Sequence, residues 1–165
     1  EVPMPDAEDA LAHAVASAER QIGVSLADAE FIIDVGYGVG SRDGIEEVIE
    51  PLRDALERLG VRTVSLGATR KVTQDLGILP DACQIGQTGV AVNPRVMLCV
   101  GVSGAPQHLE YIAERTVIFA FNKDAGAPLM TLNRHRARPV VYPVVGDLFV
   151  EVPRFIRALE SRVPS

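Results

Sequence analysis

Residues 31–41 read FIIDVGYGVGS, and this stretch decides the fold. Its first half, residues 31–35, is a short apolar run, as expected of a strand buried in a parallel sheet. Its second half carries Gly36, Gly38 and Gly40, which end the strand and lead into a helix. A strand, a glycine loop and a helix start together can cradle a phosphate, because backbone N–H groups there point at the ligand. The spacing is not the usual dinucleotide fingerprint, so the loop alone indicates only a strand-to-helix turn.

The residues after this loop alternate helical and strand patterns. Asp43 is expected to cap a helix, with Glu46 completing a capping box, and Gly60 to end it. Pro51 lies within this helix and predicts a kink or a broken first half. Further strands are expected at residues 61–66, 96–100, 116–121 and 140–142, and further helices at residues 7–22, 106–113 and 147–162. The last helix is expected to bury Phe149, Val150, Ile156 and Leu159.

This alternation predicts the α/β class: a doubly wound parallel sheet with helices on both faces, a Rossmann-like domain. We expect residues 1–27 to form an N-terminal tail and helix, and residues 28–165 to form that domain.

Composition excludes several functions. The formal net charge of −6 disfavours general nucleic-acid binding, which needs surplus Lys and Arg. No apolar run is long enough to predict a membrane span. Cys83 and Cys99 are far apart, and the histidines His13, His108 and His135 are scattered, so neither a disulfide nor a metal site is predicted.

Polar or glycine-rich clusters follow the expected strands, where parallel sheets bind ligands. They occupy residues 36–41, 67–71, 84–89, 101–108, 121–124 and 145–148. Taken together they indicate an extended ligand, for which a dinucleotide is the natural candidate. No nucleophile elbow, Ser-His-Asp order or pair of carboxylates indicates a catalytic site. On spacing alone, Arg70 is better explained as a surface residue near a turn. For His108 an exposed position in a capped helix, and for Asp147 the cap of the last helix, stay open as alternatives.

Four of the runs together resemble the alpha subunit of electron transfer flavoproteins. They are QIGQTG at 84–89, GVSGAPQH at 101–108, NKD at 122–124 followed by Ala127-Pro128, and VGDL at 145–148. Their order and intervals match the family from about Asp28 to Leu159, and the Ser-Gly-x-x-Gln-His element at 103–108 is highly specific.

The resemblance implies a domain that binds FAD in an extended, bent form. It places Thr69 and Arg70 beside the isoalloxazine ring, Thr88 near its N5, and His108 toward its carbonyl O2. Residues 103–108 would surround the ribityl chain and pyrophosphate, and Asn122, Asp147 and Leu148 would hold the adenosine end. The residues implied to bind the cofactor are Tyr37, Thr69, Arg70, Ile85, Gly86, Gln87, Thr88, Ser103, Gly104, Ala105, Pro106, Gln107, His108, Asn122, Asp147 and Leu148.

The chain also departs from the family pattern. The front loop of the family usually reads Gly-Gly-Arg-Gly, and Tyr37 replaces the arginine. The stretch between Arg70 and Gly77 is longer than usual, and residues 132–138 form an insertion, LNRHRAR, interpreted as a solvated loop rather than a docking surface for an acidic partner. The N-terminal domain that the resemblance implies for an alpha subunit is absent from this sequence, which begins at Glu1 without a methionine. Two interpretations stay open: a processed or excised fragment, and a domain that is native alone.

By this resemblance the protein is a single-electron carrier and not an enzyme. The implied partners are the beta subunit, flavin-dependent dehydrogenases that reduce the FAD, and a quinone oxidoreductase or another acceptor. The implied location is the bacterial cytoplasm or the mitochondrial matrix. Two alternatives remain: a nicotinamide-dependent oxidoreductase domain, and a relic that has lost its cofactor. Binding of nicotinamide nucleotide in place of FAD would support the first, and refusal of FAD the second.

Overall fold

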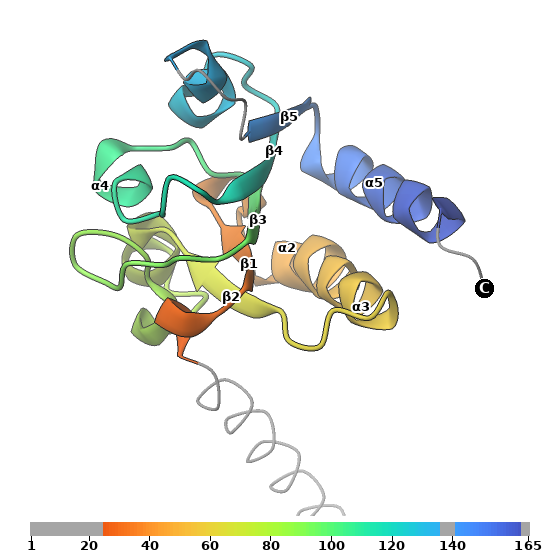
Figure 1. Ribbon diagram of the computed structural model, residues 1–165, viewed down its shortest axis with the longest axis horizontal. Helices are drawn as coiled ribbons and strands as arrows, with labels where there is room; N and C mark the ends of the chain where they lie inside the picture. Colours follow the sequence, from red (N-terminus) through yellow and green to blue (C-terminus); the bar gives the residue numbers. More distant parts are fainter. Residues whose placement is uncertain (1–24, 136–140, 163–165) are drawn as a thin grey trace, which may run out of the picture.

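The computed structural model describes residues 25–135 and 141–162, which form a wholly parallel sheet of five strands (Figure 1). The strands are β1 (Phe31–Val35), β2 (Ser65–Ala68), β3 (Val96–Val100), β4 (Val117–Asn122) and β5 (Val141–Val145). They lie in the order β2-β1-β3-β4-β5. The doubly wound α/β class predicted from the sequence is confirmed. The helix expected at residues 7–22 lies outside the described residues.

Helical segments connect the strands. The α-helices are α2 (Arg42–Gly44), α3 (Glu50–Arg58), α4 (Pro106–Leu109) and α5 (Leu148–Arg162). Shorter or irregular helical segments are η1 (Leu26–Asp28), η2 (Tyr37–Val39), η3 (Ile45–Ile49), η4 (Lys71–Asp75), η5 (Asp81–Cys83) and η6 (Pro128–His135). Within the described ranges, no helix has both the length and the apolar composition to cross a membrane.

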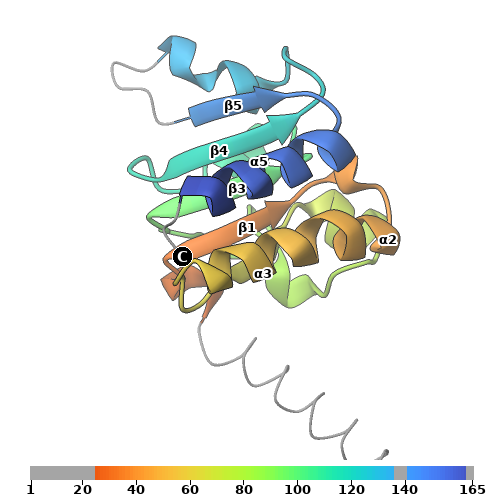
Figure 2. The ribbon, with the colours of Figure 1, turned by 90° about the vertical axis from the view of Figure 1, so that its right-hand side faces the viewer.

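The two faces of the sheet are covered differently. On one face, α3 and α5 lie side by side across the strands (Figure 2). Their apolar residues pack on Ile33, Val35 and Leu98. The opposite face, which carries Ile32 and Met97, is covered by the segment around residues 85–92, by residues next to α4 and by η6. Because side chains alternate along a strand, every second residue of β1 belongs to each core.

The strand order reverses direction between β1 and β3. From β1 the chain moves outward to β2, then returns across β1 to β3 and continues to β4 and β5. The loops that leave β1 and β3 therefore diverge to opposite faces, which opens a crevice at the carboxyl edge of the sheet. This is where the polar clusters of the sequence meet.

The start of the first long helix corrects one expectation. The N-cap residue is Ser41, and no side-chain capping bond is present there, so the capping box of Asp43 and Glu46 does not form. The disturbance expected from Pro51 is confirmed in a specific form: a π-helical turn, η3, immediately precedes α3. A wider turn relieves the clash between a proline ring and the carbonyl of the preceding turn. Gly60 ends the helix with a φ of 103°.

Two further boundaries were wrong. The strand expected at residues 61–66 lies at Ser65–Ala68, because only those residues are level with β1, where Ile32 pairs with Ser65 and Val35 with Ala68. The helix expected at residues 106–113 ends at Leu109, because Ile112 instead forms a parallel bridge with Val92. Both errors arise from pairing with distant segments, which local patterns do not contain.

The buried face of α5 also differs from the prediction. Leu148 and Val152 are buried, and Phe155, Ile156 and Leu159 are partly buried against the same core. Phe149 and Val150, expected inside, are 47% and 49% exposed. The helix starts its apolar stripe one residue earlier than the sequence suggested, so these two side chains fall on the solvent side.

The insertion at residues 132–138 begins inside η6 (Pro128–His135), so its first part is helical rather than loop. Its remainder lies outside the described residues.

The loop after β1 predicts a specific sensitivity to substitution. A Cβ at Gly36 would lie 2.2 Å from the backbone oxygen of Gly101, in the loop after β3. Neither loop can retreat without breaking the bond from the Gly36 N–H to the Val100 carbonyl, at 2.9 Å. Gly36→Ala should therefore lower the free energy of unfolding by about 1–3 kcal/mol or more, measured by urea denaturation.

Gly126→Ala is the matched control, since its Cβ would meet only the Asp124 side chain, at 3.3 Å. If both substitutions changed stability equally little, the close approach of the two loops would not matter for folding.

Candidate functional site

A cavity of about 580 Å³ lies at the carboxyl edge of the sheet. This volume is within the range of sites that hold small molecules and cofactors. Its wall is built by residues that follow four consecutive positions in the sheet: Tyr37 after β1, Thr69 after β2, Ser103 after β3 and Asp124 after β4. The end of β5 does not contribute. The cavity thus spans the point where the strand order reverses, as the fold predicts.

Most of the predicted cofactor-binding residues converge on this cavity. Those on its wall are Tyr37, Thr69, Arg70, Ile85, Gly86, Gln87, Thr88, Ser103, Gly104, Ala105, Gln107, His108 and Asn122. The structure brings them together from segments that are far apart in the sequence, and it does so through backbone bonds. The Gln87 N–H donates to the Gln107 carbonyl at 3.0 Å, and the Ile85 N–H donates to the Ala68 carbonyl at 2.9 Å.

Three predicted residues are not on the cavity wall: Pro106, Asp147 and Leu148. Leu148 is only 6% exposed and belongs to the core beneath α5. Asp147 precedes α5, and its Oδ1 accepts a hydrogen bond from the Phe149 N–H at 2.8 Å. That contact is the helix cap that the sequence allowed as an alternative.

The wall also contains residues that the sequence prediction did not include: Gly38, Lys71, Gln84, Gly101, Val102, Asp124 and Ala127. Most lie next to a predicted residue inside one of the polar clusters, so taking each whole cluster as cavity lining would have predicted them. Asp34, one layer deeper, was missed altogether. Its signal was a single ionisable residue within the apolar run of residues 31–35.

A chain of hydrogen bonds orients Thr88. The buried Thr73 hydroxyl donates to the Gln84 Oε1 at 2.6 Å, and the Gln84 Nε2 donates in turn to the Thr88 Oγ1. Because the Thr88 oxygen accepts this bond, its own hydroxyl hydrogen remains available for another acceptor. Since Thr88 lines the cavity, this chain supplies a hydroxyl donor there.

The cavity has a cationic side. Arg70 and Lys71 both lie on its wall and are exposed, and Asp124 is the acidic residue among the lining side chains. The Lys71 Nζ lies 5.5 Å from the centre of the Tyr37 ring, a cation–π distance. Tyr37 is itself 55% exposed. An anionic ligand would meet two permanent or nearly permanent positive charges here.

Thr69 provides a direct sign of a missing partner. Its Oγ1 is buried and has no hydrogen-bond partner in the part of the chain that the structure describes, although the residue lies on the cavity wall. A buried hydroxyl without a partner costs free energy, so such groups are normally satisfied by a ligand or by water. This atom is therefore a candidate contact for whatever the cavity binds.

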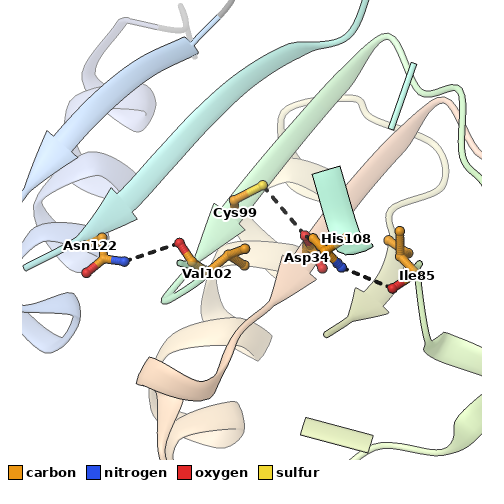
Figure 3. A network of polar contacts seen from close by, with 6 residues as sticks. All are labelled: Asp34, Ile85, Cys99, Val102, His108 and Asn122. Atoms are coloured by element: carbon orange, nitrogen blue, oxygen red, sulfur yellow. Dashed lines mark hydrogen bonds and ion pairs between the residues drawn. The ribbon is translucent and has the colours of Figure 1, made fainter. Parts of the chain in front are cut away.

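His108 is held by two acceptors inside the protein (Figure 3). The ring is buried, with 5% exposed; its Nδ1 lies 3.0 Å from the Ile85 carbonyl oxygen and its Nε2 lies 2.5 Å from the Asp34 Oδ2. Burial alone would lower the pKa of His108, but the charge of Asp34 and the bonds to Asp34 and Ile85 outweigh it, so the pKa is raised. Asp34 itself has no exposed surface.

Asn122 closes the far part of the site through two contacts. Its Nδ2 donates to the Val102 carbonyl at 3.2 Å (Figure 3), and its Oδ1 accepts from the Asp124 N–H at 2.9 Å. The side chain thereby ties the loop after β4 to the loop after β3. Within residues 25–135 and 141–162, no group of three or more His, Cys, Asp or Glu side chains is arranged to hold a metal ion.

Comparison with known proteins agrees with these features. Residues 25–113 match the family model described as the electron transfer flavoprotein FAD-binding domain. The chain is 37% identical over 134 residues to the electron transfer flavoprotein subunit alpha of Bradyrhizobium diazoefficiens, covering 81% of this chain and 38% of that one. It is 34% identical over 162 residues to the subunit alpha of Mycobacterium leprae, covering 98% and 46%. The Bacillus subtilis subunit alpha is 38% identical over 131 residues, covering 79% and 36%. The chain thus spans less than half the length of each of these curated relatives.

The His108–Asp34 pair makes a prediction about pH. Since the folded-state pKa of His108 is raised, the pair stabilises the fold fully below the ordinary histidine pKa of about 6.5, and this contribution is lost as the pH rises through the raised pKa. Between those values the free energy of unfolding should fall by up to about 1.4 kcal/mol per pH unit, measured by urea denaturation.

The double variant Asp34→Asn, His108→Gln lacks both partners of the pair and should lose this slope. A wild-type stability that rises over the same interval, or a slope that the double variant retains, would contradict the prediction.

Proposed function

Because this chain belongs to the electron transfer flavoprotein alpha-subunit family, we propose that it binds FAD in the cavity at the carboxyl edge of its sheet and acts as an electron carrier. The observation that carries the proposal is the convergence of the family runs at residues 84–88 and 101–108 on one cavity. These runs are separated in the sequence, and both contribute residues to that wall.

The residues present fit this cofactor. Arg70 and Lys71 match the charge of a pyrophosphate, and the buried Thr69 hydroxyl lacks a partner that a ligand atom can supply. Gly38 and Gly101 also line the cavity, and their lack of side chains lets the loops after β1 and β3 meet at its base. Ile85, Val102 and Ala127 give the cavity apolar wall for a flat ring.

Bound FAD would supply one-electron chemistry that no side chain in the cavity can perform. The role of the protein is then to bind the cofactor, orient it and stabilise negative charge on it. Arg70 provides a planar set of N–H donors and a permanent charge. Thr88 provides a hydroxyl donor whose direction is set by Gln84. Such donors act more strongly as the acceptor becomes anionic.

One departure from the family pattern and one unplaced pair of residues bear on this proposal. Where the family usually has arginine, Tyr37 offers an aromatic surface, and Lys71 over this ring brings a cation back to the same region. The adenosine end of the cofactor is assigned to Asn122 and to the region of Asp147 and Leu148. Since the latter two lie off the cavity wall, their assignment depends on the family resemblance alone.

The proposed electron path involves other proteins. A beta subunit is expected to complete the carrier, flavin-dependent dehydrogenases to reduce it, and a quinone oxidoreductase or another acceptor to oxidise it. The beta subunit is suggested by the names of the relatives, which are alpha subunits. The dehydrogenases and the acceptor rest on the resemblance of the runs alone. By the same reasoning the protein operates in the bacterial cytoplasm or the mitochondrial matrix.

Reconstitution tests cofactor binding. The chain is mixed with FAD, alone and together with an electron transfer flavoprotein beta subunit, and bound flavin is measured by absorbance after gel filtration. Retained flavin, reduced by one electron at a time in a coulometric titration, is the expected outcome. A colourless chain in both mixtures would contradict the proposal and favour a relic, and preferential retention of NAD or NADP would favour an oxidoreductase domain.

Arg70 should matter most among the cationic residues of the site. Loss of one charge-assisted hydrogen bond costs about 1.5–3 kcal/mol, so Arg70→Ala should weaken FAD binding by about 10- to 150-fold in an equilibrium titration. Arg154→Ala is the matched control, since Arg154 lies on α5 away from the cavity and pairs only with Glu151 on the surface. If the two variants bound FAD with equal affinity, Arg70 would not contact the cofactor as proposed.

A further inference from the structure

Beneath the cavity wall lies a buried polar group that the binding site does not require. Asp34 is a carboxylate in the middle of the sheet, on β1, with β2 and β3 on either side. It is level with Cys99 of β3 and points to the face that α4 covers, where His108 meets it (Figure 3). A buried carboxylate is costly unless it is paired, so this residue needs a physical reason to be there.

The contacts of His108 leave little freedom in its protonation. The Ile85 carbonyl can only accept, so the Nδ1 at 3.0 Å from it carries a hydrogen. The Nε2 faces the Asp34 Oδ2 at 2.5 Å. An imidazole that donates from both nitrogens is an imidazolium, and an ionised carboxylate is the partner that stabilises this form.

The neighbouring thiol supports an accepting Asp34. The Cys99 Sγ lies 3.7 Å from the same Oδ2. The pKa of Cys99 is raised well above its usual value, first by burial and then by the charge and the hydrogen bond of Asp34. The thiol therefore stays protonated and donates a hydrogen bond, so the Asp34 Oδ2 accepts one bond from Cys99 on β3 and one from His108 on α4.

We propose that Asp34 is a positioning residue that holds His108 as a doubly protonated imidazolium whose two N–H groups are both bound inside the protein. His108 would then present fixed positive charge to the cavity, and not a free N–H donor. This differs from the expectation that the ring points a donor at a carbonyl of the cofactor. Its bearing on FAD rests on the proposed function, whereas the state of the pair does not.

The pair is oriented with respect to the cavity. His108 lies on the cavity wall, whereas Asp34 lies behind it and does not reach the wall. The pair is neutral as a whole, but its positive end faces the bound molecule, which favours added negative charge there. The other charged groups on the wall are Arg70, Lys71 and Asp124, and Cys99 is the titratable group that contacts the pair from β3.

Nuclear magnetic resonance of the full chain with ¹⁵N-labelled histidine tests the pair directly. In the wild type, both ring nitrogens of His108 should stay protonated as the pH passes the ordinary histidine pKa of about 6.5. In Asp34→Asn, one nitrogen should lose its proton at a lower pH than in the wild type, because an amide offers no charge to stabilise the imidazolium. His108→Gln identifies the signals.

Cys99→Ala is the matched control: it removes the other partner of the same Oδ2 and should leave His108 doubly protonated. A wild-type His108 that loses a ring proton at or below the ordinary histidine pKa of about 6.5 would overturn the proposal, since the pair would then not stabilise the imidazolium. This measurement needs no variant, so it decides the question even if Asp34→Asn does not fold. Equal titration of His108 in wild type and Asp34→Asn would also overturn it.

A second measurement, on the chain loaded with FAD, gives the consequence for the cofactor. The difference in flavin reduction potential between Asp34→Asn and the wild type should change sign with pH. At a pH below that at which His108 of the variant loses its proton, the imidazolium has no carboxylate beside it and should raise the flavin potential above the wild-type value. At a higher pH the ring is neutral, and the flavin potential should be lower than in the wild type. A constant difference would overturn the link between the pair and the cavity. Failure to bind FAD with an intact imidazolium would instead count against the proposed function.

Discussion

The contact between the loops that leave β1 and β3 is the constraint on which the rest of the structure depends. Before they diverge to opposite faces, these loops touch at Gly36, Gly38 and Gly101, where their backbones lie so close that no Cβ fits. Gly101 also adopts a φ of 73°, which glycine accepts at no steric cost. This contact fixes the ends of β1 and β3 relative to each other, and so it also fixes the position of the cavity wall that follows them.

The residues that stabilise the fold and the residues that line the cavity lie in different parts of the sheet. Apolar residues on both faces of the sheet supply stability, and the carboxyl edge collects the polar side chains. Their directions are set by contacts within the protein: Gln84 orients Thr88, and Asn122 joins two loops. A site preorganised in this way does not have to reorder its own dipoles when a ligand becomes charged. Two buried side-chain oxygens find no hydrogen-bond partner among the described residues: the Thr69 Oγ1, at the cavity wall, and the Asp34 Oδ1, beneath it.

The Asp34–His108 pair gives the interior a charge pattern that the surface does not show. It lies below the cavity rather than in it, and it engages both nitrogens of the histidine that the family resemblance assigns to the cofactor. Electrostatic influence falls off slowly in a poorly polarisable interior, so a side chain can act on a ligand without donating a hydrogen bond to it. The carboxylate behind the imidazolium thus extends the functional site into the middle of the sheet.

The sequence alone was sufficient for the fold class, for most strand positions and for the segments that form the cavity. Short apolar runs ending at glycines are local signals, and parallel topology then brings all such ends to one edge. What the tertiary structure decided were features set by partners distant in the chain: the place of β2 beside β1, the early end of α4 caused by Val92, and the exposed side of α5 with Phe149. Asp34 belongs to the same group, because the role of a carboxylate in an apolar run cannot be inferred until its contact with His108, far along the chain, is known. Local patterns encode which residues can be buried, and only packing determines what each buried residue touches.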